Sequence, residues 1–209
     1  MNRIRLFIWI LSLLLAIPPI GPVRAAQEAT KPAGPSQIVT AFHGTLLDVM
    51  KNAKSLGIQG RYEKLNGRIE QTFHLGLMVR IASGSYWRKA SQTEIEKLVA
   101  AFSRLSIGTY ASQFDGFSGQ SFETLGEKPG PQKTTLVKSQ IIDPTSGRVD
   151  ITYVTRKIKG QWKVVDVLLD SGISELAVRR SEFRRILKTG GISGLIGVLK
   201  AKADQLLAE

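Results

Sequence analysis

The chain has 209 residues, no cysteine and a formal net charge of +12. The lack of cysteine excludes disulfides, thiolate nucleophiles, cysteine metal ligands and the acylated cysteine of a lipoprotein. The positive charge favours anionic partners, although charge alone does not separate such a partner from a merely basic surface.

The first 25 residues have the pattern of a signal peptide. Arg3 and Arg5 precede an apolar run from Leu6 to Ile17. This run is well short of the roughly 20 residues that a membrane-spanning helix needs. Small residues at Val23 and Ala25 predict cleavage after Ala25, and an uncleaved anchor is the alternative. The predicted mature protein lies in the periplasm, where its net charge of +9 favours anionic lipid head groups over nucleic acid.

The first half of the mature chain has helical patterns. A polar, proline-containing stretch at 26–35 is predicted to be a flexible spacer, and a single domain is predicted at 36–207. Apolar residues at helical spacing indicate amphipathic helices. Ser91 and Glu94 form a capping-box pattern at the start of the longest one. The predicted helices span residues 36–53, 61–82 (as one or two helices) and 91–114.

Beyond Gly119 the pattern changes to the alternation that is typical of β-strands. Short turns between the strands predict an antiparallel meander. Gly190 and Gly191 separate two final helices. The order of elements predicts an α+β fold, in which helices cover one face of a bent four-stranded antiparallel sheet and enclose an apolar cavity. The predicted strands span 120–127, 133–142, 148–158 and 161–170, and the final helices span 173–188 and 191–206.

No catalytic motif is apparent in the sequence. His43 and His74 both fall in predicted helices, without a partner at metal-ligand spacing, so a structural role is favoured for each. Asp166 interrupts an apolar run and is either a general base or a buried carboxylate bonded to a backbone amide or an arginine. The second interpretation is favoured, because an unpaired buried charge is very costly. We therefore predict no catalytic residue, metal or cofactor.

The helix predicted at 173–188 is strongly basic. Arg180, Arg184 and Lys188 fall on one of its faces, with Arg179 and Arg185 beside them. Such a face contacts anionic head groups or an acidic partner, or it is simply solvated, and the pattern leaves these alternatives open.

Six segments, spread over residues 36–205, together resemble a known family. They are Tyr86–Ala90, Thr109–Phe114 leading to Ser118–Gly119, Gly160–Val167, Ile173–Ala177, Arg179–Phe183 and Gly191–Ile196. In order and spacing they resemble the MlaC-like periplasmic phospholipid-binding proteins, also called toluene-tolerance auxiliary components. The Tyr86–Ala90 and Arg179–Phe183 segments are most similar to the branch associated with hopanoid biosynthesis, HpnM.

The resemblance implies a carrier that holds lipid tails in an internal cavity and leaves the head group near its mouth. It also implies an inner-membrane ABC transporter or another membrane lipid exporter as a partner, and the HpnM branch implies a hopanoid or related lipid as cargo. The apolar residues expected to line the cavity are equally suited to packed core. They are Leu77, Phe102, Val137, Ile141, Ile151, Tyr153, Val165, Val167, Leu176, Phe183 and Leu195.

Two other functions stay open at this point. One is an enzyme that modifies hopanoid or lipid intermediates, because α+β scaffolds host enzymes and binding proteins alike. The other is a structural subunit of an envelope ABC lipid transporter.

Overall fold

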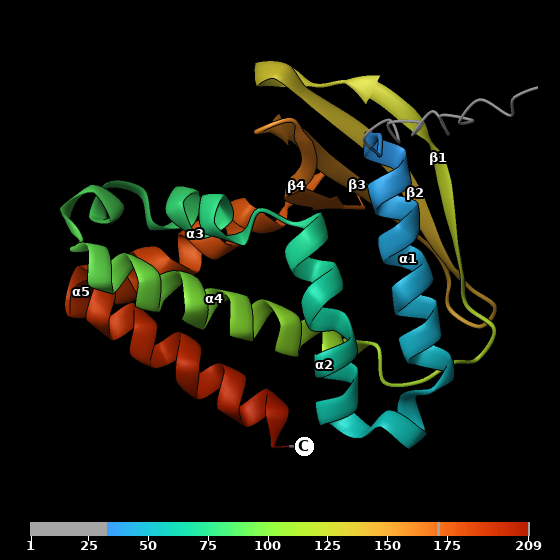
Figure 1. The fold of residues 1–209 in the computed structure, drawn as a ribbon, viewed down its shortest axis with the longest axis horizontal. Helices are drawn as coiled ribbons and strands as arrows, with labels where there is room; N and C mark the ends of the chain where they lie inside the picture. Colours follow the sequence, from blue (N-terminus) through green and yellow to red (C-terminus); the bar gives the residue numbers. More distant parts are fainter. Residues whose placement is uncertain (1–32, 171, 209) are drawn as a thin grey trace, which may run out of the picture. The chain divides into compact units, whose positions relative to one another are not determined.

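A computed structural model describes residues 33–170 and 172–208, so the predicted signal peptide and most of the predicted spacer lie outside the described residues. Helices come first along the chain, then an antiparallel sheet, then a long broken helix (Figure 1). The helices are α1 (Pro35–Lys51), α2 (Ala53–Thr72), α3 (Leu75–Ser83), the short 3-10 helix η1 (Gly84–Lys89), α4 (Gln92–Gln113) and α5 (Glu175–Leu207). The strands are β1 (Ser121–Pro129), β2 (Thr134–Asp143), β3 (Gly147–Ile158), β4 (Gln161–Leu169) and β5 (Ile173–Ser174), with the 3-10 turn η2 (Pro131–Lys133) before β2.

The helices begin and bend where local chemistry requires it. The capping box predicted at the start of α4 is confirmed, because the Ser91 side chain accepts from the Glu94 amide and the Glu94 side chain accepts from the Ser91 amide. The helix predicted from residue 61 begins earlier, at Ala53, and is kinked at Gly57. Gly57 has φ of 58° and ψ of −178°, a conformation that only glycine adopts without strain.

The sheet is an antiparallel meander, as predicted, but it has five strands and not four. The strand order is β1-β2-β3-β4-β5. The fifth strand pairs Leu168 with Ser174 and Leu169 with Ile173. Two residues are too few to show an alternating pattern, so the sequence suggested the start of a helix at this point. Ser174 instead ends β5, and its hydroxyl caps the first turn of α5.

A bulge in β4 changes which side chains face the helices. Opposite β3, Val154 pairs with Asp166 and Thr155 with Val164, which leaves Val165 as the extra residue. The side chains of Val164 and Val167 therefore both point inward, and both pack in the main core cluster. Simple alternation assigned that place to Val165, which is buried but lies outside this cluster.

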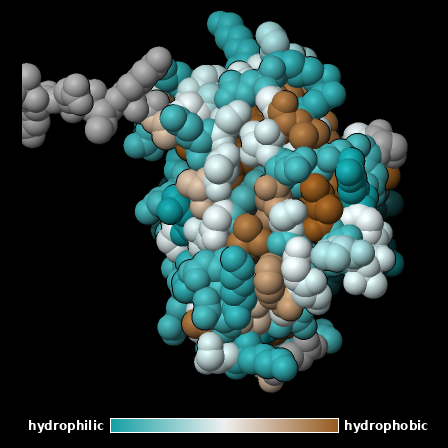
Figure 2. All heavy atoms as spheres, turned by 90° about the vertical axis from the view of Figure 1, so that its right-hand side faces the viewer, coloured by the Kyte–Doolittle hydropathy of each residue, from teal (hydrophilic) through white to brown (hydrophobic). Residues whose placement is uncertain are grey.

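The helices gather on one face of the curved sheet (Figure 1). The predicted separation of the last two helices is present as a break in α5 at Gly191, with φ of 60° and ψ of −160°. On the face that corresponds to the right-hand side of Figure 1, apolar side chains emerge in small patches among hydrophilic ones (Figure 2), which is ordinary for a protein surface. Within residues 33–170 and 172–208, no helix combines the length and the hydropathy needed to cross a bilayer.

Candidate binding cavity

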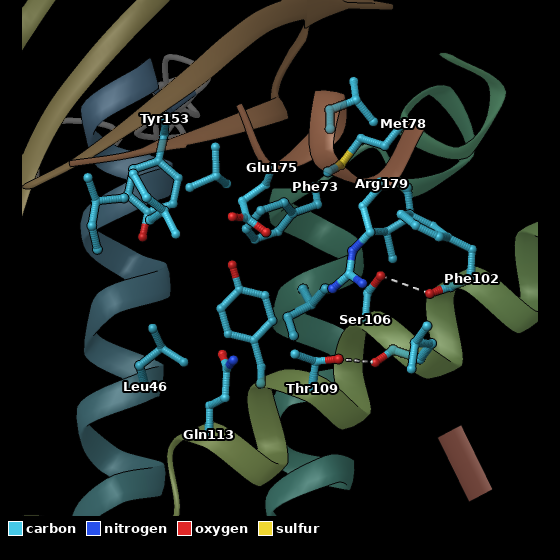
Figure 3. A pocket seen from close by; sticks show the side chains of 18 of the residues that line it. Leu46, Phe73, Met78, Phe102, Ser106, Thr109, Gln113, Tyr153, Glu175 and Arg179 are labelled. Carbon is cyan, nitrogen blue, oxygen red and sulfur yellow. Dashed lines mark hydrogen bonds between the residues drawn. The ribbon is translucent and has the colours of Figure 1, made fainter. Parts of the chain in front are cut away.

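A cavity of about 300 Å³ lies between the sheet and the helices (Figure 3). Its wall draws on α1, α2, α3, α4 and the first turns of α5 on one side, and on β1, β3 and β4 on the other. Its volume is at the lower end of the roughly 300–1,000 Å³ that small-molecule sites occupy. The apolar part of the wall consists of Leu46, Ile69, Phe73, Leu75, Met78, Phe102, Leu105, Phe114, Phe122, Ile151, Val167, Leu169 and Leu176.

Aromatic packing holds one side of the cavity in place. The buried Phe42 ring stands edge-on to Phe73 at 5.1 Å and to Tyr110 at 5.3 Å between ring centroids. Tyr110 in turn stacks on Phe114 at 5.9 Å. Edge-on and offset contacts of this kind are favourable beyond simple burial, so these rings form a fixed wall rather than a loose one.

Two polar side chains of the α4 wall have their hydrogen bonds satisfied within the helix. The Ser106 hydroxyl donates to the Phe102 carbonyl and the Thr109 hydroxyl donates to the Leu105 carbonyl, both at 2.8 Å (Figure 3). Each hydroxyl has thereby used its only donor hydrogen. The wall along α4 is therefore less polar than its sequence suggests.

Two tyrosines bring hydroxyl groups to the cavity. Tyr110 is half-buried at the cavity, and burial together with the nearby Glu175 carboxylate raises its pKa. Burial, and to a smaller extent Tyr110, raises the pKa of Tyr153 well above its usual value. Both side chains are therefore neutral phenols near pH 7, able to donate a hydrogen bond but carrying no charge.

His43 supports Tyr153 from behind the cavity wall. Its Nε2 atom lies 2.9 Å from the Tyr153 hydroxyl, and its ring stacks on Phe122 at 4.4 Å between centroids. Burial lowers the pKa of His43 to about 4, so the imidazole is neutral near pH 7. Its surroundings agree with the structural role favoured from the sequence.

His74 has a different position from the one predicted. It lies between α2 and α3 rather than within a helix, because Phe73 has an extended conformation and ends α2. Its Nδ1 atom accepts from the Leu77 amide at 3.1 Å, and its own amide donates to the Val164 carbonyl at 2.9 Å. The side chain therefore caps α3, and the backbone joins the helices to β4.

The charged groups of the cavity come from the first turn of α5. Glu175 and Arg179 both line it and are half-buried, and the Arg179 guanidinium extends toward Ser106 (Figure 3). Arg179 also forms an ion pair with Glu182 at 3.2 Å. The cavity thus combines a mainly apolar wall with one acidic and one basic side chain on the same helix.

Asp166 fixes the start of that helix. Its Oδ1 atom accepts from the amides of Val167 at 2.8 Å and Leu176 at 3.0 Å, and its Oδ2 atom accepts from the Ser174 hydroxyl at 2.6 Å. A carboxylate at a helix N-terminus is stabilised by the free amides there. The half-buried carboxylate therefore has the backbone partners expected of a structural group.

Five of the eleven predicted lining residues lie on the cavity wall: Phe102, Ile151, Tyr153, Val167 and Leu176. The other six do not: Leu77, Val137, Ile141, Val165, Phe183 and Leu195. Val137 and Leu195 are fully buried in packed core, and Phe183 packs edge-on against Phe102 at 6.3 Å, behind the wall. Val165 is displaced by the bulge in β4.

The polar members of the wall were not predicted from the sequence. Ser106, Tyr110 and Gln113 follow Phe102 at helical intervals, and this continuation of an apolar stripe by polar residues was the available signal. Glu175 and Arg179 had no such signal, because their position depends on where α5 begins. Among the residues that the structure describes, no three His, Cys, Asp or Glu side chains gather as metal ligands would.

Comparisons with known proteins agree with the architecture. The family model described as MlaC protein matches residues 41–201 of this chain. A solved structure of a phospholipid-binding protein from Ralstonia solanacearum, in complex with a phospholipid, superposes with a TM-score of 0.73. That protein is 21% identical, and the match covers 85% of this chain and 100% of that one. At this identity the likeness shows a shared fold.

Proposed function

The chain belongs to the MlaC protein family, and on that premise we propose that it is a periplasmic lipid carrier. It moves phospholipid or hopanoid between the membranes of a bacterial envelope, with the apolar part of the lipid held in the cavity. The observation that carries this proposal is the cavity wall, to which the sheet and the helices together contribute thirteen apolar side chains.

Such a cavity removes the main barrier to lipid transfer through water. A C16 tail exposes about 15 methylene-scale units, each worth roughly 0.8 kcal/mol, so its transfer into water costs on the order of 10 kcal/mol. Apolar side chains contributed by two layers replace the bilayer around the tail. Tyr110 adds a neutral donor without adding charge, which suits a tail that ends in an ester or a hydroxyl group.

The polar part of the cargo is placed by Glu175 and Arg179. They are the charged residues of the wall, and their partial exposure fits a head group that stays near water. An arginine suits a lipid phosphate, which agrees with the phospholipid seen in the Ralstonia protein. The similarity of Tyr86–Ala90 and Arg179–Phe183 to the HpnM branch instead favours a hopanoid, so both cargoes belong to the proposal.

A carrier needs a partner in at least one membrane. We infer that this chain exchanges its cargo with an inner-membrane ABC transporter, as its family resemblance implies. Transient contact brings the cavity to the partner, and the carrier then diffuses away with its cargo.

A transfer assay between two vesicle populations tests the proposal. Donor vesicles with labelled phospholipid or hopanoid and unlabelled acceptor vesicles are separated by a filter that only protein crosses. The purified mature protein is expected to move label of at least one lipid class into the acceptor vesicles. Protein that neither binds nor moves either lipid would contradict a carrier, and chemically altered lipid recovered from the assay would point to an enzyme.

A further inference from the structure

The first half of α5 has two functional sides. Glu175 and Arg179 line the cavity, whereas Arg180 and Arg184 line a separate outer hollow of about 120 Å³. The remainder of that hollow comes from the end of α3 and from η1, including Ser85 and Tyr86. One helix therefore separates the cavity from an arginine-lined outer surface.

Positive charge is concentrated around this hollow. Residues 75–89 and 175–190 together contain eight basic and two acidic residues. Their net charge of +6 is half of the +12 of the whole chain, although they make up only 31 of its 209 residues. These segments lie side by side, because α3 and η1 pack against α5 (Figure 1).

We define the basic face as Arg88 and Lys89 of η1 together with Arg180, Arg184 and Lys188 of α5, of which Arg180 and Arg184 line the hollow. All five are exposed. Within residues 33–170 and 172–208, the ion pairs are Lys64–Asp48, Arg104–Asp204 and Arg179–Glu182, and none involves the basic face. Its charges are therefore not neutralised by neighbouring carboxylates.

We propose that the basic face docks the carrier on an anionic phospholipid surface. Juxtaposed arginines and lysines are attracted to anionic bilayers, and exposed arginine suits lipid phosphates. Two half-buried aromatic residues belong to η1: Tyr86 lines the hollow with Arg180 and Arg184, and Trp87 directly precedes Arg88 in the chain. Tyrosine and tryptophan are enriched where proteins meet the head-group region, which favours a membrane over an acidic protein as the partner.

Docking through this face has a consequence for loading. The same helix also lines the cavity, so the docked protein holds the cavity residues Glu175 and Arg179 on the helix that meets the membrane. This consequence rests on the proposed function, whereas the docking itself does not.

Binding of the mature protein to vesicles tests the inference. Vesicles of phosphatidylcholine are compared with vesicles that also contain phosphatidylglycerol, and bound protein is measured by co-sedimentation. The variant Arg180→Gln/Arg184→Gln/Lys188→Gln removes three charges from the face and keeps good helix formers. The control Lys157→Gln/Lys200→Gln/Lys202→Gln removes three exposed charges elsewhere and leaves the same net charge.

The native sequence is expected to bind the anionic vesicles and to be released by salt, which screens exposed charges. The face variant is expected to bind on the order of 100-fold more weakly, because each cation near an anionic surface contributes roughly fivefold. The control is expected to stay close to the native affinity. Equal loss in both variants, or native protein that ignores anionic vesicles while binding an acidic protein, would overturn the docking surface.

Lipid loading, measured in the same three proteins by native mass spectrometry, separates the two proposals. Unchanged loading with lost vesicle binding supports docking as a distinct function of the face. Vesicle binding without any lipid uptake contradicts the carrier and leaves the docking surface intact.

Discussion

At the scale of single residues, Tyr153 links the cavity wall to the buried core. Its hydroxyl meets His43 Nε2 at 2.9 Å, and both side chains lie almost entirely out of water. Neutral histidine and neutral tyrosine satisfy each other in this setting, whereas a protonated imidazole has no carboxylate here to balance it. The pair therefore makes stability depend on pH.

Acidification is expected to destabilise the protein through His43. Its pKa is about 4 in the folded protein, below the ordinary histidine value of 6.5, so the unfolded chain takes up a proton first as the pH falls between these values. The stabilisation is present above pH 6.5 and is lost toward pH 4, by about 3 kcal/mol. Urea unfolding at pH 7 and pH 4.5 measures this loss.

The variant His43→Gln should lose most of that pH dependence. The control His74→Asn keeps a cap for α3 and leaves His43 in place, so its pH dependence should remain steep. Asp143 does not interfere, because hydrogen bonds from the Ser146 and Thr145 amides hold its pKa at about 2, and its contribution is lost only below the ordinary aspartate value of 3.8. A steep dependence that persists in His43→Gln would contradict the assignment.

A large side chain that enters the cavity from the sheet should block lipid binding. Val167→Trp places a large side chain on the cavity wall, and overpacking of about 1–3 kcal/mol is expected to weaken lipid binding by roughly tenfold to a hundredfold. The control is Leu168→Trp on the opposite face of β4. Lipid titration measures the binding affinity of both variants, and unfolding curves check that both are folded. Unaltered binding by Val167→Trp would show that the cargo does not enter between sheet and helices.

At the scale of elements, the start of α5 positions the cavity residues Glu175 and Arg179. Asp166 bonds to Leu176 and Ser174 across the β4–α5 junction. We expect Asp166→Ala to lower the free energy of unfolding by about 1–3 kcal/mol, because it leaves a helix N-terminus without its acceptor. Asp166→Asn keeps an acceptor and should recover most of this loss in urea unfolding. Equal stability of Asp166→Ala and the native protein would contradict a structural role for Asp166 at the start of α5.

The break at Gly191 provides a matched pair of substitutions. Gly191→Ala is expected to cost about 1–3 kcal/mol, because φ of 60° with ψ of −160° is strained for any residue with a Cβ atom. Gly190→Ala has open space around its new Cβ and no positive φ, so it should be neutral or stabilise by up to about 1 kcal/mol. Thermal unfolding of the two variants compares them directly, and similar transitions would mean that the break is not needed.

Much of this element structure was predictable, and the exceptions have physical causes. The capping box at Ser91 and the glycine break near residue 191 are local signals, so the sequence was sufficient for both. The pairing of Ile173 and Ser174 with β4, and the bulge at Val165, depend on contacts with distant strands. Periodicity within one segment carries no information about such contacts, and the cavity wall was therefore predicted only in part.

At the scale of the whole molecule, the fold places an apolar cavity and a basic surface on two sides of one helix. In the proposed function the cavity holds the lipid, and in the further inference the basic face is where the protein meets a membrane. Neither role was fixed by charge or composition alone, because a net charge of +12 is compatible with many partners. The two proposals are related because residues of α5 contribute both to the cavity wall and to the basic face.

Native mass spectrometry of protein purified from the periplasm, combined with lipid extraction, tests the carrier most directly. We predict a stoichiometric adduct whose mass and extracted lipid identify a phospholipid or a hopanoid. Protein that is recovered empty, and that stays empty after either lipid is offered in excess, would contradict the account.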